Sequence, residues 1–199
     1  MAAKRHVVRG PDGRASLRAM DTITPDDVVA FWRQAGMQKW FQGGDAFDRE
    51  CDERFRDAHF AAGRRELEDW LETAEGGLAL LILLDQIPRN IFRDSGHAFA
   101  TDSLARHYAQ RMIDAGHDRS FDADLRGFVY LPFEHSEDLA DQRRSVALFA
   151  DVDNAEYRKY AQAHLDVIER FGRFPHRNRA LGRVNTPDEQ TWLDEGGGF

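Results

Sequence analysis

One stretch decides the fold of this chain: Leu78-Ala79-Leu80-Leu81-Ile82-Leu83-Leu84-Asp85-Gln86-Ile87-Pro88-Arg89-Asn90. Its first seven residues are all apolar, which predicts an element that is buried on every side. Periodicity alone would also allow a strand, but leucine and alanine favour a helix, and the sequence offers no second strand to pair with it. We therefore expect a buried central helix over residues 78–84, which Pro88 should end.

Amphipathic helices are expected on both sides of this segment. Thr24-Pro25-Asp26-Asp27 and Thr186-Pro187-Asp188-Glu189 are start signals, because each has a hydroxyl N-cap, a proline and acids in the first turn. Between them, apolar spacing and glycine stops predict further helices over residues 45–63, 64–71, 97–115, 122–130, 137–150 and 154–171. The sequence thus predicts an all-α fold of about nine helices, in antiparallel pairs that form a tetratricopeptide-like repeat or bundle.

Composition limits the class of protein. The 199 residues, of which 42% are hydrophobic, suit one domain. We assign residues 1–22 to a flexible leader, 23–195 to a single helical domain and 196–199 to a flexible tail. Because there is no secretory signal, no apolar run long enough to span a membrane and only one cysteine, Cys51, we expect a soluble cytoplasmic protein. The net charge of -8 makes nucleic acid an unfavourable partner.

The first polar motif follows the central helix directly. Asp85 and Arg89 are spaced to pair across one helical turn, and Asn90 follows them. One interpretation is a helix end that is fixed by a salt bridge and an amide. The other is the polar end of a buried helix that points into a pocket.

The second polar motif is Tyr130-Leu131-Pro132-Phe133-Glu134-His135-Ser136-Glu137-Asp138. His135 and Glu137 lie close enough along the chain for acid–base chemistry or for a metal. A metal would need a further ligand from elsewhere, so no metal or cofactor is predicted. The same residues also resemble a helix start, in which Ser136 caps the helix and the acids face the dipole.

The third motif is the strongest, because it concentrates arginines in an acidic protein. His164 is followed by a loop in which arginines surround His176, and planar guanidinium groups bind carboxylate or phosphate. The alternative is that these arginines bond helix carbonyls and the acids of the first two motifs. The candidate ligand-binding residues of this loop are Arg173, Arg177, Asn178 and Arg183.

Together, these motifs resemble those of the bacterial family known as domain of unknown function nine-two-four. The resemblance rests on the residues from Leu78 to Phe92, the Tyr130–Asp138 motif, and the residues from His164 to Asn178, and it extends over about residues 24–193. It implies an all-helical, tetratricopeptide-like fold and no known activity. The sequence departs from the family pattern at Arg33-Gln34, after Phe31-Trp32.

The motifs lead to a functional hypothesis. A small carboxylate or phosphate ester is expected to bind between the end of the central helix and the arginine–histidine loop, held by Arg89, Asn90 and the loop residues. His176, His164 and His135, positioned by Asp85 or Glu137, could serve as acids or bases in hydrolysis or isomerisation, although turnover is left open. The alternative is a tetratricopeptide-like interaction module that binds an acidic peptide. A third interpretation is an internal ionic network that specifies the fold.

Overall fold

The computed structural model describes residues 23–199, so the predicted leader lies outside the described residues. This part of the chain is all-α and contains no strand. Its helices are α1 (Pro25–Gln42), α2 (Gly44–Gly63), α3 (Ala74–Leu81), α4 (Ile87–Ile91), α5 (Asp102–Asp114), α6 (Ala123–Glu134), α7 (Leu139–Ala150), α8 (Ala155–Phe171) and α9 (Pro187–Asp194). Because α3 and α4 belong to one continuous run, residues 23–199 form eight separate helices, where about nine were predicted.

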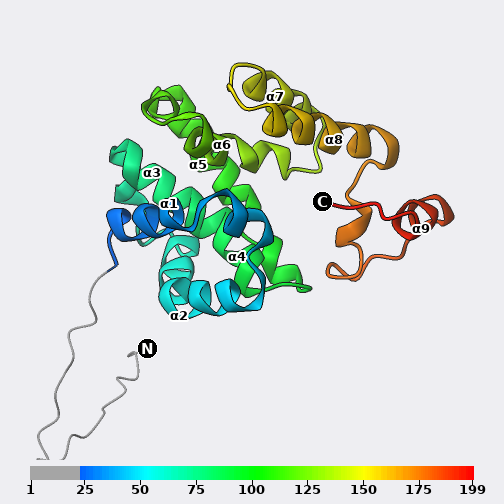
Figure 1. The fold of residues 1–199 in the computed structure, drawn as a ribbon, viewed down its shortest axis with the longest axis horizontal. Coiled ribbons are helices and arrows are strands. Elements are labelled where there is room, and N and C mark those ends of the chain that lie inside the picture. The colour runs from blue at the N-terminus through cyan, green and yellow to red at the C-terminus, as the bar shows by residue number, and fades with distance from the viewer. Residues whose placement is uncertain (1–22) are drawn as a thin grey trace, which may run out of the picture.

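The helices lie in two groups along the length of the molecule (Figure 1). Helices α1 to α4 pack against one another at one end, and α5, α6, α7 and α8 then pack each against the next. The loop after α8 and helix α9 form the opposite end. The tetratricopeptide-like repeat stays a prediction.

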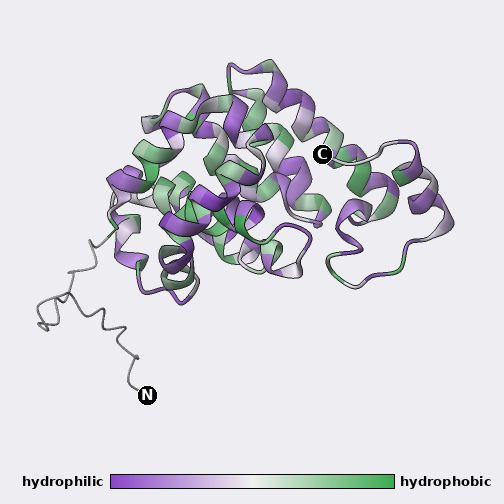
Figure 2. Cartoon of the chain, turned by 60° about the horizontal axis from the view of Figure 1, so that its bottom comes forward, coloured by the Kyte–Doolittle hydropathy of each residue, from purple (hydrophilic) through white to green (hydrophobic). Residues whose placement is uncertain are grey.

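The central helix is buried as the sequence predicts. Every side chain from Leu78 to Leu84 has 0% exposure, and the segment lies at the centre of the main hydrophobic core. Most of the surrounding helices alternate between hydrophilic and hydrophobic residues, as expected for helices with one face on a core (Figure 2). Within residues 23–199, no helix has the length and hydrophobicity that crossing a bilayer requires.

The prediction that Pro88 ends the central helix was wrong. The chain continues through a π-helical turn, η2 (Ile82–Gln86), into α4, and Pro88 lies in the first turn of α4. Proline cannot donate a hydrogen bond to the carbonyl of Leu84, four residues earlier, but Thr101 Oγ1 donates to that carbonyl instead. The ring of His59 contributes a second bond, from Nδ1 to the carbonyl of Leu83 at 2.8 Å. Side chains thus replace the missing backbone donors, so the helical run continues past Pro88 and includes the polar residues that follow it.

Three other predicted boundaries differ from the structure. Residues 64–71 form no α-helix but end in the 3₁₀ turn η1 (Glu68–Glu72), because Arg65 adopts a left-handed φ of 64°. The helix predicted over 97–115 divides into η3 (Gly96–Phe99) and α5. Helix α6 passes through Pro132 and ends at Glu134, not near Tyr130, since its hydrogen bonds resume from the His135 N–H to the Leu131 carbonyl at 2.9 Å.

A second, smaller apolar cluster lies at the C-terminal end of the structure. Val167, Ile168 and Phe174 form its buried part, and Phe171 and Trp192 pack against it. Because this cluster is separate from the main core, the polar contacts between the two are important for how the C-terminal loop is positioned.

The replacement of the proline's missing hydrogen bond by Thr101 can be tested with Thr101→Val, which keeps the shape of the side chain and removes the donor to the Leu84 carbonyl. We expect a loss of about 1–3 kcal/mol in the free energy of unfolding, because a buried carbonyl is left without a partner. The matched control is Thr191→Val, whose hydroxyl donates to the Pro187 carbonyl on an exposed helix; its change should be within about 0.5 kcal/mol. Urea denaturation measures both, and equal effects would contradict the account.

Candidate functional site

The π-helical turn places the Asp85 carboxylate in the interior, where only 1% of the residue is exposed. Three neighbours surround it: the His135 ring, with Nδ1 2.8 Å from Oδ1; the Gln86 amide, which donates to Oδ2 at 2.6 Å; and the Arg89 guanidinium at 3.2 Å. Burial alone would raise the pKa of Asp85, but Arg89 and His135 together hold it below its usual range. Asp85 is therefore charged, and it orients both neighbours.

A second carboxylate completes the pairing of the buried arginines. Asp102 accepts two hydrogen bonds from Arg89, at 2.8 and 2.9 Å, and lies 3.6 Å from Arg177. The Arg177 guanidinium lies between the Phe99 and Phe174 rings, and it donates to the His135 carbonyl at 2.9 Å. Burial lowers the pKa of Arg177 to about 10, which still leaves it charged. Arg177 thus connects the C-terminal loop to the end of α6.

Two further titratable groups adjoin His135. The His164 ring, on α8, has its centroid 6.3 Å from that of His135, and its Nδ1 donates to the Tyr160 carbonyl at 2.8 Å. The same nitrogen is 3.3 Å from Glu134 Oε1, while Glu134 Oε2 is buried without a partner among the described residues. Burial lowers the pKa of His164 to about 3, and burial together with the charge of Asp85 raises the pKa of Glu134 to about 8. Both groups are therefore neutral at pH 7.

The turn after α6 is held in place by a side chain from α7. The fully buried Gln142 amide donates to the carbonyls of Glu134 and Ser136, at 2.5 and 2.6 Å. The helix start predicted here is present, but its cap is Asp138, which accepts from the N–H groups of Ala140 and Asp141, and not Ser136. This arrangement fixes Glu134 and His135 at the junction of two helices.

Residue Phe199 covers the other side of His164. The two rings are stacked, with centroids 3.6 Å apart, and Phe199 also contacts the ring of His176 at 5.6 Å and that of Phe174 at 6.2 Å. Burial and the charge of Arg177 lower the pKa of His176 to about 4, and its buried Nδ1 has no partner within the described residues. We call His135, His164 and His176 the histidine cluster. Phe199, which is 50% exposed, separates it from solvent on one side.

The other arginines of the loop bind protein carboxylates. Arg183 makes two hydrogen bonds to Glu137, at 2.7 and 2.8 Å, and Glu137 also accepts from the Phe174 N–H at 2.7 Å. Arg173 bonds both oxygens of Glu189, at 2.6 and 2.8 Å. The Arg183–Glu137 pair agrees with the interpretation in which loop arginines bond acids of the first two motifs, whereas the pairing of Arg173 with Glu189 of the closing helix was not predicted.

The structure brings most of the predicted site residues together, but not all of them. Asp85, Arg89, His135, His164 and Arg177 form one connected group, and His176 lies next to it across Phe199. All three predicted histidines therefore lie at one place.

The remaining predicted residues lie around this group. Glu137 and Arg183 pair beside Phe174, and Asn178 joins Arg173 on Glu189, with its amide 3.3 Å from the carboxylate. Asn90 donates to the Gln86 carbonyl at 3.1 Å within its own helix. Within residues 23–199, no three His, Cys, Asp or Glu side chains are placed to hold a metal ion.

Sequence reasoning missed Asp102, Glu134 and Phe199. Asp102 follows Phe99-Ala100-Thr101, and nothing in that stretch marks it as the partner of a distant arginine. Glu134 is next to His135 in the second motif, and this position could have identified it as a candidate site residue. Its burial, however, could not be inferred from the sequence. Phe199 belongs to the tail that was predicted to be flexible.

Comparison with known proteins places this arrangement in a family. A family model described as "Bacterial protein of unknown function (DUF924)" matches residues 28–197. The chain belongs to this family. A solved structure, the protein of unknown function ATU0120 from Agrobacterium tumefaciens, is similar to it with 53% sequence identity and a TM-score of 0.84; the match covers 86% of this chain and 97% of that one. No curated protein matches. The DUF924 membership confirms the resemblance seen in the sequence and supplies no activity.

The role of Asp85 can be tested by Asp85→Asn, which keeps the shape and removes the charge. We expect a loss of about 3–5 kcal/mol in the free energy of unfolding, because Arg89 and His135 lose the anion that they surround. The control is Glu50→Gln, which removes an exposed partner of Arg54 at 3.7 Å and should cost less than about 1 kcal/mol. Chemical denaturation at neutral pH measures both. An Asp85→Asn protein as stable as the control would show that the network is dispensable.

The raised pKa of Glu134 predicts a pH dependence of stability. Between about pH 6.5 and 8 the folded protein keeps a proton on Glu134, which the unfolded chain, with a pKa near 4.5, has released. The free energy of unfolding should therefore fall as the pH rises through this window, by up to about 1.4 kcal/mol per pH unit. The buried histidines oppose this trend only at lower pH, because their pKa values are lowered from 6.5.

Glu134→Gln should remove this fall, since glutamine does not titrate. Urea denaturation of both proteins at several pH values across the window measures the two slopes. A wild-type protein whose stability is level or rises there, or a variant with the same slope as wild type, would contradict a protonated Glu134.

Proposed function

We propose that this chain binds a small anionic molecule, a carboxylate or a phosphate ester, at the histidine cluster and transfers protons to and from it. The observation that carries the proposal is the contrast between two buried carboxyl groups near His135. Asp85 is held charged by Arg89 and His135, whereas Glu134 is held protonated by burial and by the charge of Asp85. Neighbouring groups whose pKa values are separated in this way are suited to act as a base and an acid.

The Asp85–His135 pair supports the role of base. Asp85 is bonded to Nδ1 of the ring, which favours a proton on that nitrogen and leaves Nε2 with its lone pair. No hydrogen bond to His135 Nε2 occurs within residues 23–199. In the proposed step, Nε2 accepts a proton from the bound molecule or from a water that attacks it, and Asp85 stabilises the imidazolium that forms.

Glu134 and His164 support the complementary role. The neutral Glu134 carboxyl has a proton to give, and His164 Nδ1 lies 3.3 Å from it. We propose that Glu134 itself gives a proton to the bound molecule, while His164, whose Nδ1 proton is bonded to the Tyr160 carbonyl, holds the carboxyl in place. This transfer would complete an isomerisation or a hydrolysis. The two reactions need the same acid and base and differ in whether a water takes part.

The uncharged imidazoles support an anionic ligand, because they can take up protons that neutralise it. Asp85 and Asp102 balance Arg89 and Arg177, while the three imidazoles are uncharged. An entering anion would raise the pKa of these imidazoles, so its binding should be accompanied by proton uptake. The acidic peptide that the sequence suggested, bound by a tetratricopeptide-like surface, is the competing proposal.

The test is binding of inorganic phosphate, glycerol phosphate, a series of short dicarboxylates and an acidic hexapeptide to wild type and to His176→Gln. His176 is suited to this test because its Nδ1 makes no hydrogen bond that the substitution would break. We expect near wild-type stability and binding at least about tenfold weaker in the variant. The control is His107→Gln, at an exposed position of α5 outside both the histidine cluster and the cavity between α5, α6 and α7, which should bind as wild type does.

Calorimetry near pH 5.5 and near pH 7.5 adds a second readout, because proton uptake should make binding tighter at the lower pH. For a bound carboxylate with a neighbouring carbonyl, exchange of carbon-bound hydrogen in D₂O should occur in wild type and stop in His135→Gln. If no small anion binds, or if only the peptide binds and His176→Gln has no effect, the proposal fails and the peptide-binding alternative takes its place.

A further inference from the structure

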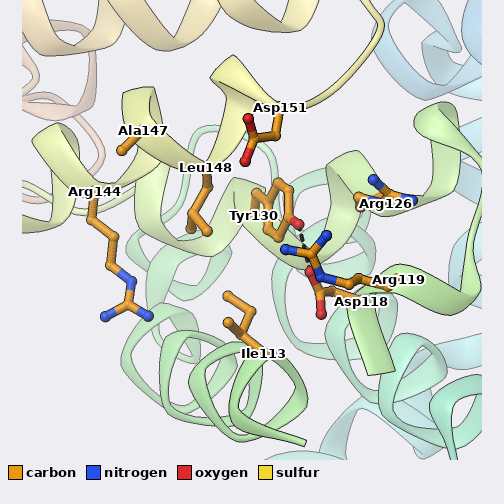
Figure 3. Close-up of a pocket in the computed structure, with 9 residues that line it drawn as sticks. All are labelled: Ile113, Asp118, Arg119, Arg126, Tyr130, Arg144, Ala147, Leu148 and Asp151. Carbon is orange, nitrogen blue, oxygen red and sulfur yellow. Dashed lines mark hydrogen bonds between the residues drawn. The ribbon is translucent and has the colours of Figure 1, made fainter. Parts of the chain in front are cut away.

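A cavity of about 630 Å³ lies away from the histidine cluster, between α5, α6, α7 and the turn η4 (His117–Ser120). Figure 3 shows it with the residues that line it. These are Ile113, Asp118, Arg119, Arg126, Tyr130, Arg144, Ala147, Leu148 and Asp151, and we call the space the arginine cavity. Its volume is in the range of pockets that hold small molecules.

The three arginines differ from most others in the described part of the chain. Arg89, Arg173 and Arg183 each bond a carboxylate, whereas Arg119, Arg126 and Arg144 make no ion pair within residues 23–199. The Nε atoms of Arg126 and Arg144 are buried and have no hydrogen-bond partner there. The same is true of the Nε atoms of Arg177 and Arg183, which lie outside the cavity. What distinguishes the three cavity arginines is that, within the described residues, no carboxylate pairs with them, which leaves their guanidinium groups able to bind an anion.

One end of the cavity is organised around a buried hydrogen bond. Tyr130 donates its hydroxyl to Asp118 Oδ2 at 2.6 Å, and the Arg119 guanidinium lies beside this pair in Figure 3. Burial and Asp118 raise the pKa of Tyr130, while Arg126 and Arg119 act in the opposite direction, which places both guanidinium charges near the hydroxyl. Arg126 is itself anchored by a bond to the Phe121 carbonyl at 3.0 Å. Of the two carboxylates that line the cavity, Asp118 thus already accepts a hydrogen bond from Tyr130, and Asp151 is the other, so the three arginines exceed the carboxylates by one charge.

The rest of the lining combines an apolar middle with the charged residues Asp151, above Tyr130, and Arg144. Ile113 and Leu148 lie between the Tyr130 end and Arg144 in Figure 3, and Ala147 lies above them on α7. A ligand that fits this lining has an oxyanion at one end and a compact apolar body. A phosphate monoester, with three acceptor oxygens, can bond two guanidinium groups at once more fully than a carboxylate can.

From this geometry we infer that the arginine cavity is a second binding site, for a phosphate monoester with a flat apolar body, whose phosphate lies between Arg119 and Arg126. The site shares no residue with the histidine cluster and does not depend on its proposed function. The apolar body contacts Ile113 and Leu148, and Arg144, whose guanidinium lies over the Phe133 ring, is at the far end.

The probe is phenyl phosphate, measured by calorimetry against the whole chain, with inorganic phosphate and benzoate as comparisons. We expect one phenyl phosphate per chain at the arginine cavity, bound at least about tenfold more tightly than either comparison. Arg119→Gln should weaken it by about tenfold or more. Arg119 is exposed, so this variant should fold normally. Ala147→Trp, which adds a large ring at an exposed position of the lining, should abolish binding.

Two controls separate this site from other cationic surfaces. In the first control, Arg143→Gln, the substituted arginine is next to Arg144 in the sequence but lies outside the cavity, where it pairs with Glu169 at 3.5 Å. This variant should bind phenyl phosphate as wild type does. His176→Gln should also leave this binding unchanged, so a failure of the histidine-cluster proposal would not affect the result. The inference is overturned if phenyl phosphate does not bind, if Arg119→Gln and Ala147→Trp bind it as wild type does, or if inorganic phosphate or benzoate binds equally well.

Discussion

The charge of Asp85 is the constraint around which the rest of the structure is arranged. A carboxylate with 1% exposure is stable in its charged form only if cations and donors surround it, and the chain supplies these from three separate places: Arg89 one turn later, Gln86 beside it and His135 fifty residues away. His135 in turn lies at the end of α6, where the Arg177 guanidinium bonds its carbonyl. Removing the Asp85 carboxylate would leave the His135 ring and the Gln86 amide without their acceptor.

This network also joins two apolar regions that do not form one core. The main core contains the central helix, whereas the cluster of Val167, Ile168 and Phe174 is separate from it. Arg177 contacts Phe174 of the smaller cluster, bonds the His135 carbonyl at the end of α6 and lies 3.6 Å from Asp102 on α5. Because α5 and α6 both contribute to the main core, one buried cation connects the two regions. Buried ion pairs contribute little net stability compared with apolar packing, but they fix one geometry. A precisely held group of titratable side chains is what acid–base chemistry needs.

The sequence predicted the helical elements well because their signals are local. The helix starts predicted at Thr24 and Thr186 are both present, each as a capping box, and the apolar run from Leu78 to Leu84 is fully buried. The effect of Pro88 could not be predicted, since the groups that compensate for it come from His59 and Thr101, far away in the sequence. Local sequence rules predict the backbone hydrogen bond that a proline removes, but they do not predict the hydrogen bonds that distant side chains supply in its place.

The candidate site was predicted in part for a similar reason. Spacing indicated the Asp85–Arg89 pair, and residue type indicated the histidines and loop arginines. Which carboxylate each arginine binds is decided by tertiary packing, so the pairing of Arg173 with Glu189, the contribution of Asp102 and the protonation of Glu134 required the structure. The arginine cavity was missed altogether, because its three arginines come from three different elements and form no motif.

The most direct test of the central claim is the protonation state of the His135 ring, measured by nitrogen-15 NMR on the whole chain at neutral pH. The account predicts a neutral ring that carries its proton on Nδ1, hydrogen-bonded to Asp85 and slow to exchange with water, with Nε2 unprotonated. It also predicts that this signature is lost in Asp85→Asn. A ring protonated on Nε2 alone, or one that exchanges as an exposed histidine does, would contradict it.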